Sequence, residues 1–92
     1  MKAIHANISF WKQNHYPFFK VVEIPETELK ELMAKLSRTD IIEWLMWNDS
    51  NGIYSDEASL REFGAIMTIE EGTEIMLRQA EENRIVSYLK II

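Results

Sequence analysis

The chain has 92 residues, of which 47% are hydrophobic, and a formal net charge of −5 at pH 7. This length predicts a single domain, residues 1–92, and the hydrophobic fraction is that of a folded protein rather than a disordered one. The absence of cysteine excludes disulfides and cysteine-ligated metal sites, and it favours a cytoplasmic protein. The longest apolar run, residues 44–47, is far too short to cross a membrane, so we expect a soluble protein without a membrane partner.

The first quarter of the chain has the pattern of a β-hairpin. Residues 3–11 alternate between apolar and polar side chains, which is typical of a strand with one buried face. Residues 18–24 are aromatic and β-branched and predict a second strand. The polar residues between them end at Pro17 and would form the connecting loop.

The segment that follows Pro25 predicts a helix over residues 26–36. Its apolar residues recur at the spacing of one helix face: Leu29, Leu32, Met33 and Leu36. Glu26 and Glu31 each precede a lysine by four positions, which stabilises the exposed surface of a helix. Pro25 suits the first position of such a helix.

Ser37 or Thr39 begins a second helix, which is expected to extend to about Asn48. At 100° per residue its apolar side chains cover about 260° of the circumference, whereas a surface helix needs little more than about 100°. The helix is therefore either wrapped by the core or placed between the core and a partner. A buried strand is the alternative, but the leucine, the methionine and the capping signals favour a helix.

Two shorter signals predict the third and fourth helices. Ser55 begins a short helix that ends at Gly64. Thr68 and Glu71 form a capping box, so the fourth helix begins there.

Residues 84–92 are rich in β-branched and aromatic side chains that alternate, and they predict a third strand. The alternative is that they prolong the fourth helix. We favour the strand because three strands with helices on one face make a stable layer, whereas two do not. The predicted fold class is α+β: a small three-stranded antiparallel sheet from the two ends of the chain, packed by four short helices in the order ββααααβ. A helical domain with an N-terminal hairpin or arm is the alternative.

Five residues have the composition of a calcium-binding loop: Asp49, Asn51, Gly52, Asp56 and Glu57. Their spacing does not fit an EF-hand. With the glycine at position six, Trp47 would stand at the first ligand position and Ala58 at the last. We therefore predict a turn followed by a helix start, and no metal site.

No motif predicts catalysis or a cofactor. The sequence contains no G-x-S-x-G, no P-loop and no G-x-G-x-x-G. His5 and His15 each lack a second ligand three or four positions away, so both are expected to be exposed to solvent. A Ser–His–Asp triad assembled in space stays open. We predict no catalytic residues, no metal and no cofactor.

The functional hypothesis from the sequence is a non-catalytic protein–protein interaction module that associates with itself as a homodimer or with another protein. Trp44 and Trp47 are three positions apart on one helix flank, so they form either core or interface. The predicted partner-binding residues are Trp44, Trp47 and Tyr54. An exposed strand edge is a second possible contact.

Two other functions stay open. Residues 1–20 contain three lysines, no acidic residue and half of the ten aromatic residues, which is compatible with a small nucleic-acid-binding regulator. The acidic total argues against it, because nucleic-acid binding needs clustered cations. The third hypothesis is an enzyme or ligand-binding domain whose site is assembled from scattered residues.

Overall fold

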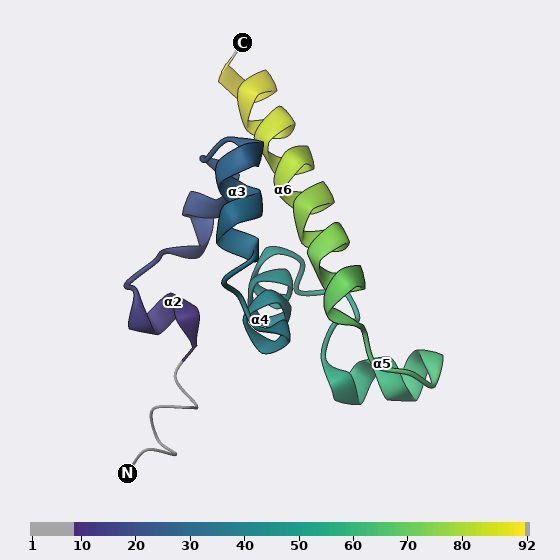
Figure 1. Ribbon diagram of the computed structural model, residues 1–92. Helices are drawn as coiled ribbons and strands as arrows, with labels where there is room; N and C mark the ends of the chain where they lie inside the picture. Colours follow the sequence, from purple (N-terminus) through teal and green to yellow (C-terminus); the bar gives the residue numbers. More distant parts are fainter. Residues whose placement is uncertain (1–8, 92) are drawn as a thin grey trace.

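The computed structural model describes the backbone of residues 9–91 and the side chains of residues 9–86. All regular structure in this part of the chain is helical (Figure 1). The elements are α2 (Phe10–Gln13), the 3-10 helix η1 (Phe18–Val22), α3 (Glu26–Met33), α4 (Arg38–Asn48), α5 (Asp56–Phe63) and α6 (Ile69–Ile91). The predicted α+β class, with its three-stranded sheet, is therefore wrong.

Helix α6 is the longest element and the axis on which the others pack. It makes its main contacts with α4, η1 and α3. Figure 1 shows α3 and α4 along one side of α6, while α5 projects outward near the beginning of α6. Helix α3 runs antiparallel to α6, and the last turns of α6 extend beyond the beginning of α3 (Figure 1).

The strand predicted over residues 3–11 is contradicted at its end, and the residues before Ser9 lie outside the described part of the chain. The Ser9 hydroxyl accepts a hydrogen bond from the Lys12 amide (3.3 Å) and so caps α2. The Trp11 indole then donates to the carbonyl oxygen of Asp40 (3.0 Å). A side-chain contact with α4, rather than strand pairing, holds this segment.

The second predicted strand, residues 18–24, is also wrong, because Phe18–Val22 is a 3-10 helix. Its β-branched residues Val21 and Ile24 are buried in the core. The carbonyl oxygen of Phe18 accepts a hydrogen bond from the Trp44 indole (3.0 Å). The apolar character of this segment therefore reflects burial, and not a place in a sheet.

The predicted helix over residues 26–36 is confirmed with an earlier end. Helix α3 ends at Met33, and Leu36 remains buried in the core although it follows the helix. The expected pair of charges is present: Lys30 Nζ lies 3.1 Å from a carboxylate oxygen of Glu26. Both groups are exposed, so this pair stabilises the fold by no more than about 1 kcal/mol.

The capping signals of the next two helices are confirmed. Ser37 begins α4 as a full capping box, in which its hydroxyl accepts from the Asp40 amide and the Asp40 carboxylate accepts from the Ser37 amide. Ser55 begins α5 by accepting from the Ala58 amide (3.2 Å). Gly64 ends α5 at a φ of 76°, the left-handed conformation that glycine adopts at least cost.

The capping box of the fourth helix is confirmed as well, since Thr68 and Glu71 exchange side-chain-to-amide hydrogen bonds at 2.8 and 3.1 Å. The strand predicted over residues 84–92 is wrong, because α6 continues to Ile91. Neither glycine nor proline interrupts the helix after Gly72. Ile85 and Val86 are about half exposed, and the modest helix penalty of β-branched residues is too small to end the helix.

The core lies between α6 and the helices beside it. Its fully buried larger side chains are Val21, Leu29, Ile41, Trp44, Leu45 and Met76. Gly72 allows α6 to approach α4 closely, because a Cβ at this position would lie 3.1 Å from Ile41 Cγ2 and 3.2 Å from Met67 Cε. A side chain at this position would require Ile41 and Met67 to shift by a few tenths of an ångström.

Candidate interaction surface

Trp44 and Trp47 occupy different environments on α4. Trp44 has no exposed surface and donates its indole hydrogen to the Phe18 carbonyl. Trp47 is 49% exposed, and its ring stacks on that of Phe18 at a centroid distance of 5.4 Å and an angle of 25°. Stacking on Phe18 holds the Trp47 ring in place while half of its surface faces solvent.

The solvent side of α4 carries further apolar residues. Met46 is 49% exposed, and Ile42, one turn earlier on the same side, is only partly buried. Ile42, Met46 and Trp47, with Glu43 between Met46 and Trp47 at 100° per residue, form a surface that we call the α4 outer face. The opposite side of the helix carries the buried residues Ile41 and Leu45. Helix α4 therefore has one apolar side in the core and another that faces solvent.

Tyr54 is buried by the loop that follows α4. Its hydroxyl donates to the Asp49 carboxylate (2.7 Å) and accepts from the Gln79 side-chain amide (2.8 Å). Burial, and then the contact with Asp49, raise the pKa of Tyr54 above its ordinary value. The side chain thus joins the loop to α6 and presents little surface to a partner.

The carboxylates of Asp49, after α4, and Asp56, the first residue of α5, both have partners within the chain. Arg38 makes two hydrogen bonds to Asp56, at 2.6 and 2.7 Å, and this ion pair lowers the pKa of the Asp56 carboxyl. Asp49 accepts from Tyr54, and its carbonyl oxygen accepts from the Gly52 amide (3.1 Å) in the predicted turn. Among the described residues, no three side chains of metal-binding type come together.

The N-terminal aromatic residues pack on one another. Trp11 lies 5.5 Å from Phe10, 5.7 Å from Tyr16 and 5.2 Å from Phe18, measured between ring centroids, and it is buried. Lys20 Nζ lies 5.3 Å from the centre of the Tyr16 ring. Burial of the Tyr16 hydroxyl, with a smaller contribution from the nearby Glu28, raises its pKa. These rings therefore fasten α2 and η1 to the body of the protein.

The structure describes only one of the two histidines, His15. His15 is exposed, as predicted, and has a φ of 48°. His5 lies outside the described residues.

A groove lies between α3 and α6, and the sequence did not predict it. It has a volume of 640 Å³ and lies between the second half of α3 and the first half of α6. Ile69, Thr73 and Leu77 line it at four-residue intervals along α6. This spacing was visible in the sequence, but it could not show that α3 leaves the row partly uncovered.

The comparisons of this chain with protein-family models, curated proteins and solved structures find no match. Between residues 9 and 91, none of the helices combines the length and the apolar character that a membrane span requires.

Proposed function

We propose that this protein is a non-catalytic interaction module that forms a homodimer through the α4 outer face. The observation that supports the proposal is the half-exposed Trp47, held by Phe18 on a helix whose other side is already buried. Tryptophan is the residue most enriched at the energetic centres of protein interfaces. Of the three predicted partner-binding residues, Trp44 and Tyr54 are buried, so Trp47 carries the contact.

The charge of the α4 outer face favours a second copy of the chain as the partner. Residues 41–48 contain a single charged residue, Glu43. The chain as a whole carries a net charge of −5, and five of its acidic residues lie between residues 70 and 82 of α6. From residues 41–48, each copy would bring one charge to the contact, the Glu43 carboxylate, which is far fewer like charges than α6 would bring.

The geometry of such a dimer is simple. In a two-fold dimer the same surface is used by both copies, so Trp47 of one protomer would lie near the α4 outer face of its partner. Met46 and Ile42, one turn apart, supply apolar side chains against which a tryptophan can pack. We also propose a cytoplasmic location, which is supported by the absence of cysteine.

A charge placed on this face tests the proposal. The Met46→Lys variant alters an exposed side chain, so it leaves the core intact while it places a cation in the interface. The matched control is Leu60→Lys on α5, where an equally exposed apolar residue is replaced. Sedimentation equilibrium should show that Met46→Lys is monomeric and that Leu60→Lys associates like the wild type. Equal association of all three proteins would contradict the use of α4.

A further inference from the structure

The groove between α3 and α6 has an apolar floor. Met33 and Leu36 are buried at its base, and Ala34 is exposed at its edge. From α6, Leu77 is only partly buried and Ile69 is 40% exposed. These side chains form an apolar strip, interrupted on α6 by Thr73, for which α3 supplies one wall and α6 the other.

The groove continues along α6 past its first half. A second hollow, of 410 Å³, shares Glu74 and Leu77 with it and ends at Ile85, whose side chain is exposed. From Ile69 to Ile85 the helix rises by sixteen residue steps, or about 24 Å at about 1.5 Å per residue. This is the length of a helix of about four turns laid alongside α6.

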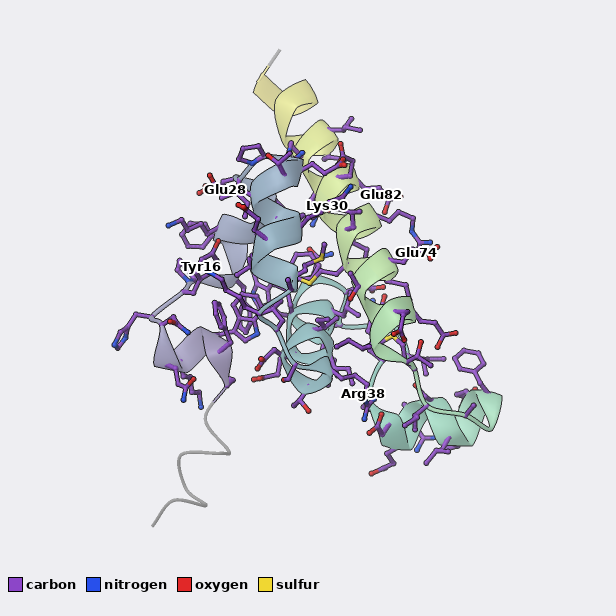
Figure 2. All side chains as sticks on the ribbon, viewed as in Figure 1. Tyr16, Glu28, Lys30, Arg38, Glu74 and Glu82 are labelled. Atoms are coloured by element: carbon purple, nitrogen blue, oxygen red, sulfur yellow. The ribbon has the colours of Figure 1, made fainter. Side chains whose placement is uncertain are left out.

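The rim of the strip is mainly acidic. Five glutamates border the two hollows: Glu26, Glu70, Glu74, Glu81 and Glu82. Only two cations border them, Lys30 and Arg78. Figure 2 shows Lys30 on α3, whereas Glu74 and Glu82 come from α6, two turns apart.

Some of these charges already have partners within the chain. Lys30 is paired with Glu26 at 3.1 Å, and Glu81 lies 3.6 Å from Arg84. The ion pairs among the described residues do not include Glu70, Glu74 or Glu82. The outer edge of the strip therefore has carboxylates in excess.

We propose that this groove binds an amphipathic helix of a partner protein, with apolar residues toward the floor and lysine or arginine on its flanks. Helix-in-groove recognition uses an apolar strip of this length, read by side chains at i, i+3, i+4 and i+7. The excess of carboxylates on the rim selects for basic flanks and attracts a basic partner over distance. A second copy of this acidic chain would instead meet like charges here.

The groove is separate from the α4 outer face, so this proposal does not depend on the dimer. The apolar floor comes from α3, the segment after it and α6. Ile42, Met46 and Trp47 line neither hollow. Met46→Lys is therefore expected to bind a helical partner as the wild type does, even if it no longer dimerises.

A synthetic peptide of about sixteen residues is the probe, with leucines at the spacing of one helix face and lysines on both flanks. Fluorescence anisotropy of the labelled peptide should show saturable binding to the full chain. A scrambled peptide of the same composition is expected to bind at least about tenfold more weakly, because it has no apolar face. Equal binding of the two peptides would overturn the proposal, since it would show attraction by net charge alone.

Charge reversal on the rim makes the test specific. The double variant Glu74→Lys/Glu82→Lys should lose at least about tenfold in affinity for the lysine-flanked peptide and gain affinity for a glutamate-flanked one. The matched control is Glu57→Lys/Glu62→Lys on α5, which changes the net charge equally outside the groove. An equal loss in both double variants would contradict recognition at α6.

A blocking variant tests the floor independently of charge. Ala34→Trp replaces an exposed residue at the edge of the groove and is expected to fill it without disturbing the core. Peptide binding should then be lost, while circular dichroism and the urea midpoint stay close to those of the wild type. A variant that is folded by these measures and still binds the peptide normally would show that the peptide binds elsewhere.

Discussion

Trp44 and Trp47 lie one turn apart on α4 with their ring centroids 6.2 Å apart, yet Trp44 is fully buried and Trp47 is half exposed. The boundary between core and solvent thus passes between two neighbouring rings. This explains why the apolar residues of α4 cover so much of its circumference. One part of them fills the core, and the remainder forms the α4 outer face.

Replacing each tryptophan by alanine should therefore have very different effects on stability. Trp44→Ala leaves a cavity and removes the indole hydrogen bond to the Phe18 carbonyl, and we expect a loss of about 3–5 kcal/mol. Trp47→Ala removes a half-exposed ring and should cost about 1 kcal/mol. Urea denaturation of the two variants, at concentrations where both are monomeric, measures the difference. Equal losses would contradict the placement of the two rings.

The Arg38–Asp56 pair gives the stability a dependence on pH. Because the folded pKa of Asp56 lies below its ordinary value of 3.8, the pair stabilises the fold above that value. This contribution is lost as the pH falls through the lowered pKa of the folded state. The Asp56→Asn variant should be less stable than the wild type at neutral pH. It should also lose less stability than the wild type between about pH 5 and about pH 2.

Urea denaturation across this pH range provides the comparison. Glu57→Gln is the matched control, because Glu57 stands next in the sequence and its side chain is far more exposed. Parallel pH profiles for wild type and Asp56→Asn would show that the Arg38 pair does not stabilise the fold.

The helix boundaries from Ser37 to Glu71 could be predicted because they depend on local chemistry. A serine or threonine that caps a helix, and a glycine that ends one, can be recognised from the few residues around them. The strands predicted over residues 18–24 and 84–92 were wrong because their composition is not specific to a sheet. Val21 is buried by helices and not by neighbouring strands, and Ile85 and Val86 are about half exposed on α6.

The candidate surface was partly visible in the sequence. The wide apolar coverage of α4 indicated that the helix could face both core and partner, but periodicity alone could not assign Trp44 inward and Trp47 outward. That assignment depends on η1, whose Phe18 carbonyl receives the Trp44 indole hydrogen. The α3–α6 groove depends on the end of α3 at Met33, which the sequence placed three residues too late.

Arg84 is predicted to stabilise the junction between α6 and η1. Its guanidinium donates to the carbonyl oxygens of Val22 (3.3 Å) and Ile24 (2.6 Å), which end the 3-10 helix region. Arg84→Met should reduce the free energy of unfolding by about 1–3 kcal/mol, because hydrogen bonds from a charged donor are lost. Arg61→Met on α5, where the side chain is mostly exposed, should change it by less than about 0.5 kcal/mol. Equal losses of stability for Arg84→Met and Arg61→Met in thermal denaturation would contradict the stabilising contact of Arg84.

Gly64 is expected to stabilise the fold through its left-handed backbone conformation. A Cβ at this position would meet no neighbouring atom. The Gly64 φ of 76° is unfavourable for residues with a Cβ, although no atom lies within 4 Å of a Cβ built there. Gly64→Ala should therefore cost about 1 kcal/mol, and Gly64→Asn, which tolerates this conformation better, should cost less. Denaturation curves that rank alanine as no worse than asparagine would contradict a backbone origin for the effect.

Sedimentation equilibrium of the wild-type chain at micromolar concentrations tests the proposed dimer most directly. We expect the molar mass to rise with concentration from 10.9 kDa, the mass of one chain, towards twice that value. The Met46→Lys variant should remain at the mass of one chain over the same range. A wild-type protein that stays monomeric throughout would contradict self-association through the α4 outer face.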